Sequence, residues 1–350
     1  MTDNQPDIID LLAQSSAELA AIRRQRPDAV HNTQLSFHAL LETESSLTLA
    51  ERYHIAAYVA QLNPVATARE FYADLSAEEE PSPRIAHARN FAQQLITAPA
   101  LATQQQLQEL EQHFSKDELV SLAQLIAFLA YQLRLIHGLR ILGGHESNKK
   151  FAPLEPELPS LAATFVRHTL GWKPWITPLA AHEMTNEQRE SLIKPERIHQ
   201  PYFRLLARDP AALQARTLTD LDIFYNVDGG LTRAERELAA TVTSRLNGCV
   251  YCTSVHAART LDEAPEHTAR IDALLADAHA DLGDPRWNAL SEAARAITVL
   301  NFDDSHVELL RTVGCDTAAI VDLINSAAFF NWANRLMLSL GEEQVPQKLR

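Results

Sequence analysis

The chain has 350 residues and a mass of 39.0 kDa, which is enough for two domains with complete hydrophobic cores, so its size does not require a stabilising disulfide or metal. Its net charge of -14 opposes contact with phosphate backbones and anionic lipid, and we therefore expect neither nucleic acid nor a membrane as a partner. Three cysteines and an acidic start without a signal-like segment are typical of a cytoplasmic protein, the localisation we expect.

Helix-forming residues dominate the chain, which contains only ten glycines. Apolar residues recur at helical spacing in residues 35–41, 85–95, 119–135, 238–246 and 320–340. Patterns of alternation that indicate strands are scarce. Polar residues interrupt the longest apolar stretch, Leu119–Ile136, so we interpret it as a buried helix of a folded domain rather than a membrane span. The fold class that the sequence predicts is all-α.

Residues 145–160, HESNKKFAPLEPELPS, interrupt the helical periodicity with three prolines and a run of polar residues. We place a domain boundary there, which predicts one domain at residues 1–150 and a second at residues 151–350. Shortly after the boundary, Trp172 and Trp175 flank Pro174. We expect these residues to form a loop that docks on the protein's own surface.

The two predicted domains are related in sequence. LTLAERYHIAAYVAQLN (residues 47–63) aligns without gaps on LTRAERELAATVTSRLN (residues 231–247), an offset of 184. Each copy opens with a capping box, Thr48 with Glu51 and Thr232 with Glu235. Residues 119–135 align on residues 320–336 at an offset of 201, so the second copy carries 17 more residues between the matches. We therefore expect a tandem repeat of one helical fold.

The stretch NGCVYCTSVH, residues 247–256, holds two of the three cysteines and a histidine. At the offset of 184, Glu237, Cys249, Cys252 and His256 align on Tyr53, Val65, Ala68 and Tyr72 of the first copy. The first copy thus keeps the expected fold without these four groups. We infer that the cysteine pair is not needed for folding, and that the N-terminal domain is a scaffold or interface module.

The spacing of these residues suggests how they meet. On a first helical turn, Cys249 and Cys252 would have Cβ atoms about 5–6 Å apart, and His256 would share a face with Cys252. That helix position is expected to lower the pKa of the thiols. Gly248 is expected to adopt the left-handed conformation that ends the preceding helix. This break would let the chain fold back and bring Glu237 near the thiols, where it could accept a proton.

The pattern Glu237, eleven residues, Cys249-Val-Tyr-Cys252, three residues, His256 resembles the active-site motif of the AhpD-like alkylhydroperoxidases in the carboxymuconolactone decarboxylase superfamily. LTRAERELAATVTSRLNGCVYC resembles the core segment of that family, and FFNWANRL (residues 329–336) its closing helix. WKPW and PYFRLLARDP (residues 172–175 and 201–210) resemble its peroxidase-related branch. Residues 1–150 resemble the cysteine-free branch, and residues 151–350 the alkylhydroperoxidase domain.

The resemblance implies a thiol-dependent peroxidase. In such a family the second cysteine attacks the peroxide and the first resolves the product, which assigns these roles to Cys252 and Cys249. Glu237 and His256 would form the proton relay. The expected partners are an organic hydroperoxide and a dithiol reductant, such as a lipoyl or thioredoxin-like protein, with no cofactor or metal and with assembly into homo-oligomers. Tyr251 departs from the pattern, because well-studied members have a histidine between the cysteines.

Other readings of the same residues stay open. A zinc site could use Cys249, Cys252 and His256, although a closed structural site needs a fourth ligand. A decarboxylase-type lyase would need acid–base groups but no cysteine, and a non-catalytic redox-sensing helical assembly would suit the cysteine-free first half. We expect Cys315 to be a small buried residue beside an Asp316 N-cap. The aromatic residues Phe329, Phe330 and Trp332 are most simply core or interface residues.

Overall fold

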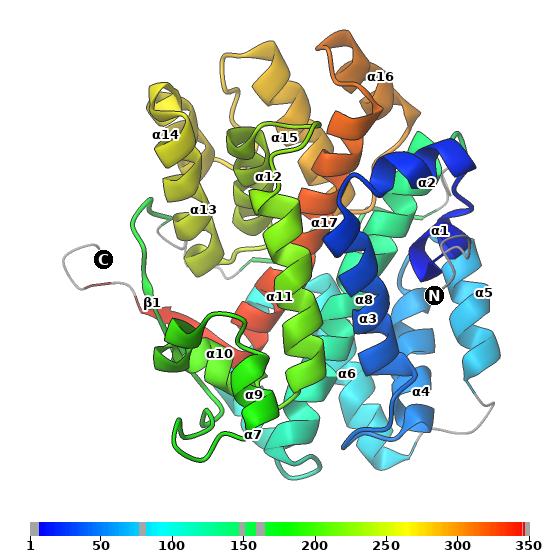
Figure 1. The fold of residues 1–350 in the computed structure, drawn as a ribbon, viewed down its shortest axis with the longest axis vertical. Helices are drawn as coiled ribbons and strands as arrows, with labels where there is room; N and C mark the ends of the chain where they lie inside the picture. Colours follow the sequence, from blue (N-terminus) through cyan, green and yellow to red (C-terminus); the bar gives the residue numbers. More distant parts are fainter. Residues whose placement is uncertain (1–6, 77–81, 147–150, 159–164, 345, 347–350) are drawn as a thin grey trace.

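The computed structural model describes residues 7–76, 82–146, 151–158, 165–344 and 346 (Figure 1). Seventeen α-helices and two short strands are found in these residues, which confirms the expected all-α class. The predicted domain boundary at residues 145–160 lies partly outside the described residues, and its described part, residues 151–158, contains no helix or strand. The division into domains at this point stays a prediction.

The first part of the chain forms α1 (Ile8–Ala13), α2 (Ala17–Arg23), α3 (Pro27–Leu41), α4 (Leu49–Gln61), α5 (Ala66–Leu75), α6 (Pro83–Thr97), the 3-10 helix η1 (Pro99–Leu101), α7 (Gln104–Leu110) and α8 (Lys116–Leu142). The rest forms β1 (Gly171–Pro174), α9 (Asn186–Glu190), η2 (Pro195–His199), α10 (Pro201–Leu206), α11 (Pro210–Tyr225), α12 (Arg233–Leu246), α13 (Val250–Glu263), η3 (Pro265–His267), α14 (Thr268–Ala276), α15 (Pro285–Thr298), α16 (Asp304–Thr312), α17 (Thr317–Leu340) and β2 (Gly341–Gln344). All five segments with helical periodicity lie in helices, and both predicted capping boxes are present.

The centre of the molecule is built from helices of both sequence halves. The two longest helices, α8 and α17, pack against each other, and α3 packs along α11 (Figure 1). One continuous hydrophobic cluster includes side chains from α1 to α17. Among the described residues, only α8 is long and apolar enough to span a membrane, and its most apolar window is entirely buried inside the protein. Burial on all sides explains why α8 is mostly apolar although it lies inside a folded protein.

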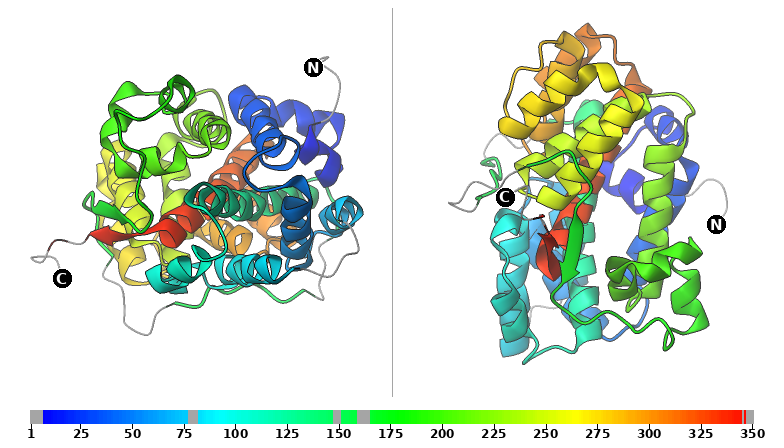
Figure 2. Two further views of the ribbon diagram at one scale, coloured as in Figure 1. Left: turned by 90° about the horizontal axis from the view of Figure 1, so that it is seen from below. Right: turned by 90° about the vertical axis from the view of Figure 1, so that its left-hand side faces the viewer.

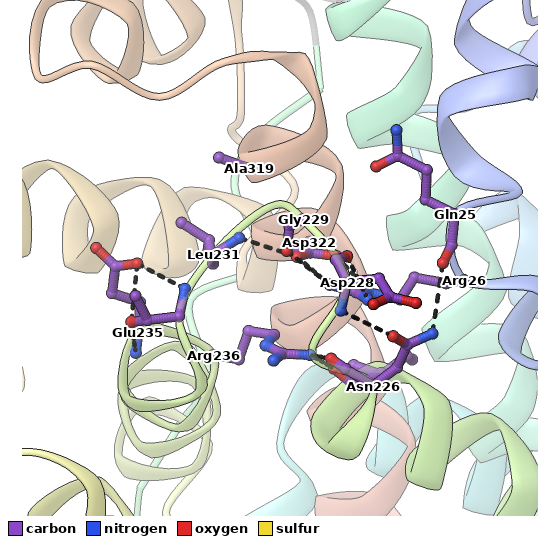
Figure 3. Close-up of polar contacts among 12 residues, drawn as sticks. Gln25, Arg26, Asn226, Asp228, Gly229, Leu231, Glu235, Arg236, Ala319 and Asp322 are labelled. Carbon is purple, nitrogen blue, oxygen red and sulfur yellow. Dashed lines mark hydrogen bonds and ion pairs between the residues drawn. The ribbon is translucent and has the colours of Figure 1, made fainter.

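A buried ion pair links Arg26, just before α3, with Asp322 on α17 (Figure 3). The Arg26 guanidinium donates to both carboxylate oxygens of Asp322 on α17, at 3.0 and 2.8 Å, and also to the carbonyls of Asp228 and Gly229. The carboxylate of Asp322 accepts the Leu231 amide as well, at 3.0 Å. Since both charges are almost fully buried, each depends on the other for compensation. This pair fixes the turn that leads into α12.

Trp172 lies in a strand, so the loop expected around it is wrong. β1 pairs antiparallel with β2, the direct continuation of α17 (Figure 2). The Trp172 indole is buried and donates its Nε1–H to the Met337 carbonyl at 3.1 Å, so the expected docking onto the protein's own surface is correct. The partner strand lies about 170 residues away in sequence, too far for a local pattern to indicate the pairing.

The helix bounds follow the offsets seen in the sequence. From α3 to α11 the start shifts by 183 residues (210 − 27), from α4 to α12 by 184 (233 − 49) and from α8 to α17 by 201 (317 − 116). The additional helix α14 lies where the second copy has its extra residues. This order is compatible with the tandem repeat, which stays a prediction.

Candidate functional site

The turn between α12 and α13 positions the cysteines. Gly248 has φ +72°, the left-handed conformation expected for it, and the Cys249 amide donates to the Ser244 carbonyl at 2.9 Å. This is the hydrogen bond that closes a helix ending in a left-handed residue. A Cβ atom at Gly248 would lie 2.8 Å from side-chain atoms of Ala100 and Leu158, so the site also lacks room for a larger residue. The chain can therefore reverse at this point.

Cys249 is the N-cap residue of α13, and Cys252 lies in its first turn. Both are free thiols and both are buried. Burial raises the pKa of the Cys249 thiol well above its ordinary value, and the neighbouring Cys252 thiol raises it further. The expectation that the helix N-terminus lowers the pKa of the thiols is therefore wrong for Cys249, because removal from water outweighs the helix dipole there. Cys249 stays protonated in the reduced protein.

Glu237 and His256 meet across the α12–α13 turn. The Nδ1 atom of His256 lies in hydrogen-bond contact with Oε2 of Glu237, whose carboxylate is completely buried. The other oxygen, Oε1, accepts from Nε of Arg233 at 2.7 Å, one helical turn earlier on α12. Sequence reasoning brought Glu237 towards the thiols, whereas the structure pairs it with the histidine. Its effect on the thiols would therefore pass through His256.

The charge state of Glu237 follows from its partners. Burial acts against ionisation, yet the charges of His256 and Arg233 and the hydrogen bond from His256 hold the pKa of Glu237 below its ordinary value. The carboxylate is thus ionised at neutral pH and accepts the Nδ1 proton of His256. The other ring nitrogen, Nε2, makes no hydrogen bond among the described residues. It can therefore receive a proton from a neighbouring group.

Aromatic side chains wall the histidine. The ring of Phe330 on α17 lies 4.1 Å from the His256 ring in an edge-to-face arrangement, and Phe224 on α11 lies 5.9 Å away. Phe329 packs against Phe330 at 5.9 Å. These residues belong to the core, as expected, and they also keep water away from the buried charge pair. A low-polarity wall strengthens the interaction between Glu237 and His256.

Cys252 and His256 lie one turn apart on α13, and no hydrogen bond joins them. Tyr251, between the two cysteines, is half-buried, and burial raises the pKa of its hydroxyl. Cys315 is buried beside the Asp316 N-cap, as predicted. Sequence reasoning missed Arg233 as a partner of Glu237, although the i, i+4 spacing of opposite charges on one helix was a usable signal.

Metal binding was one of the open alternatives. In the part of the chain that the structure describes, no group of three or more His, Cys, Asp or Glu side chains could hold a metal ion. Glu237, a carboxylate that could supply the fourth ligand, instead contacts His256 and Arg233. The arrangement suits proton transfer between a thiol and a histidine better than metal coordination.

A comparison with models of protein families gives a match within the second half of the chain. Residues 210–296, from the start of α11 into α15, match the family model described as Carboxymuconolactone decarboxylase family. This domain includes Glu237, both cysteines of the motif and His256. A search of curated proteins found no match. The matched domain therefore fits the wider superfamily that the motif resembles.

Proposed function

We propose that the protein reduces organic hydroperoxides through Cys252 and Cys249, with His256 and Glu237 as the proton relay. The observation that carries this proposal is the buried Glu237–His256 pair. Its histidine lies one helical turn from Cys252, and the Nε2 atom of that ring makes no hydrogen bond with the residues that the structure describes. Such a carboxylate orients the ring and stabilises the imidazolium that forms when the histidine takes a proton. The cysteine pair next to it supplies the redox chemistry.

The reaction balances as two steps. His256 accepts the Cys252 proton, and the Cys252 thiolate attacks the outer peroxide oxygen. The O–O bond breaks, and the sulfur becomes a sulfenic acid. The alkoxide takes the proton from His256 and leaves as an alcohol. A base then removes the proton of Cys249, and the thiolate attacks the sulfenic sulfur; the disulfide forms, and the hydroxide that leaves takes up that proton as water. The raised pKa of Cys249 means that this step needs a base, and His256, neutral again, is the group to which we assign this role. An external dithiol, oxidised to its own disulfide, restores both thiols.

A lyase of the decarboxylase type is the second candidate, because the matched family carries that name. It would use the acid–base pair alone. The cysteines distinguish the two functions, since a lyase would be indifferent to their replacement. A lipoyl or thioredoxin-like reductant, assembly into homo-oligomers and a cytoplasmic location remain predictions.

We also propose that residues 1–150 are a second copy of the fold that has lost the chemistry. In support, Arg52 donates to the carbonyls of Leu40 and Thr43. The residue at the offset of 184, Arg236, donates to the carbonyls of Ile223 and Asn226, each 183 residues later than its counterpart. Equivalent buried arginines thus hold equivalent loops.

Peroxide consumption in the presence of a dithiol reductant tests the proposed function. The wild type should consume cumene hydroperoxide, Cys252→Ser should lose this activity, and Cys315→Ser should keep it, because Cys315 lies beyond the matched domain on the loop before α17. Equal consumption by Cys252→Ser and wild type would contradict the proposal. Activity on a carboxymuconolactone that survives in Cys252→Ser would favour the lyase.

A further inference from the structure

Arg216 is the least compensated buried charge among the described residues. Seven arginines are buried there, and six of them donate to carboxylates or backbone carbonyls: Arg23, Arg26, Arg52, Arg134, Arg236 and Arg335. Arg216, on α11, is 7% exposed and forms no hydrogen bond or ion pair with any described residue, and its Nε is fully enclosed. A buried guanidinium without an acceptor is costly.

The surroundings of Arg216 do not supply the missing acceptor. The guanidinium lies 5.1 Å from the ring centroid of Phe329 and 5.8 Å from that of Trp332, both on α17. Aromatic faces attract a cation but accept no strong hydrogen bond. Arg197 interacts with Arg216 repulsively. Asp220, one turn after Arg216 on α11, interacts with Arg197 and with Tyr202 but forms no ion pair with Arg216. An unpaired guanidinium beside aromatic faces suits an organic anion.

Tyr202 connects this cation to the cysteines. Its hydroxyl oxygen is also fully enclosed without a hydrogen-bond partner, and its ring packs edge-to-face on Trp172 at 5.3 Å. Both Arg216 and Cys252 interact electrostatically with this hydroxyl. Burial raises the pKa of Tyr202, so the hydroxyl stays a neutral hydrogen-bond donor. Two buried donors without a hydrogen-bond partner among the described residues, Arg216 and Tyr202, thus lie in the neighbourhood of the Cys252 thiol.

The same aromatic cluster links Arg216 to the proton relay. Phe329, below the guanidinium, contacts Phe330, and Phe330 contacts His256. Phe224 lies two turns after Arg216 on α11, about 12 Å along the helix axis, and also contacts His256. Arg216 and His256 thus border the same aromatic cluster.

We infer that Arg216 and Tyr202 form a carboxylate-binding subsite next to Cys252, and that the substrate is a hydroperoxide bearing a carboxylate on an apolar body. The planar guanidinium matches a carboxylate, and the aromatic walls favour an apolar body over a free inorganic anion. The statement about the substrate rests on the proposed function, whereas the carboxylate subsite does not. Arg216 and Tyr202 are binding residues in this account and take no part in the redox step.

Direct binding tests the subsite without any turnover. Cuminate has the carboxylate and the apolar body but no peroxide group. We expect it to bind the wild type and to bind Arg216→Gln about tenfold or more weakly, the scale of a lost charge-assisted hydrogen bond. Arg140→Gln is the matched control, because it removes the same charge from a side chain whose one hydrogen bond to a described residue goes to Gln14. Equal binding of cuminate by Arg216→Gln and wild type, or no binding by the wild type, would overturn the subsite.

Tyr202→Phe provides a second variant that keeps the ring packing if Arg216→Gln does not fold. Loss of the hydrogen bond from this neutral hydroxyl to the carboxylate should weaken cuminate binding about tenfold. Unchanged cuminate binding by Tyr202→Phe would show that the hydroxyl does not contact the carboxylate. If Arg216→Gln also fails to fold, this result overturns the proposal.

The kinetic experiment compares cumene hydroperoxide with its para-carboxylate derivative. The ratio of kcat/KM for the carboxylated over the neutral peroxide should fall about tenfold or more in Arg216→Gln. An unchanged ratio contradicts the proposed substrate class. If the wild type reduces neither peroxide, the proposed function fails while cuminate binding still decides the subsite.

Discussion

Glu237 and His256 lie 19 residues apart on two helices, and the carboxylate of the first accepts the Nδ1 proton of the second inside an aromatic wall. Loss of the negative charge should weaken the histidine as a base. We expect Glu237→Gln to lower kcat/KM for peroxide reduction about 10²-fold, the usual contribution of a positioned base. Glu263→Gln, which changes an exposed carboxylate on α13, the helix that carries His256, is the control and should behave as wild type. Equal rates of peroxide reduction by Glu237→Gln and wild type across pH would show that the role of Glu237 is purely structural.

The stability of the protein should depend on pH through the same carboxylate. The pKa of Glu237 in the folded protein is lower than its ordinary value of 4.5. The ionised carboxylate therefore contributes to the free energy of unfolding fully above pH 4.5. This contribution is lost as the pH falls through the lower pKa of the folded state. Between about pH 6 and about pH 3, the free energy of unfolding should fall more steeply for wild type than for Glu237→Gln. Urea unfolding at a series of pH values measures this difference. Parallel curves would mean that the ion pair adds no stability.

Gly248 should be sensitive to substitution for two separable reasons. Its φ of +72° disfavours a side chain, and a Cβ atom would collide with Ala100 and Leu158. Gly283 has a similar φ of +64° but no atom within 4 Å of the added Cβ, so Gly283→Ala isolates the backbone effect. We expect Gly248→Ala to be less stable than Gly283→Ala by about 1–3 kcal/mol, the range for overpacking. Chemical denaturation of both variants gives the comparison, and equal losses would show that the neighbours move aside.

Arg26 should be essential for stability because its partner is buried. Arg26→Ala leaves the Asp322 carboxylate without its cation, and removing one member of a buried pair costs about 3–5 kcal/mol. The exposed pair between Arg167 and Asp272 is the control, and Arg167→Ala should cost about 0–1 kcal/mol. Thermal and urea unfolding measure both. A small effect of Arg26→Ala would mean that water reaches Asp322 and replaces the arginine.

The sequence predicted those features of the fold that depend on local patterns. Helical periodicity located α3, α6, α8, α12 and α17, and capping boxes marked the starts of α4 and α12. The left-handed Gly248 followed from its place after a helix. Strand β1 was missed because its partner is β2, at the far end of the chain.

The sequence predicted which residues belong to the site, but it did not predict the contacts among them. Spacing placed Cys249, Cys252 and His256 together because they share one helix, whereas the contact between Glu237 and His256 depends on how α12 and α13 pack. The raised pKa of Cys249 depends on burial, which the helix position alone does not reveal. Arg216 has no distinctive neighbours in sequence, and its missing acceptor appears only in the packed structure.

The central claim is that peroxide oxidises Cys252 and that Cys249 resolves the product. The most direct measurement treats the reduced protein with one equivalent of cumene hydroperoxide and maps disulfides by mass spectrometry of unreduced peptides. The account predicts loss of two hydrogen atoms and one bond between Cys249 and Cys252, with Cys315 still a thiol, and a stable sulfenic acid on Cys252 in Cys249→Ser. A protein that keeps all three thiols after this treatment, or one that carries the sulfenic acid on Cys249 in Cys252→Ser, would contradict it.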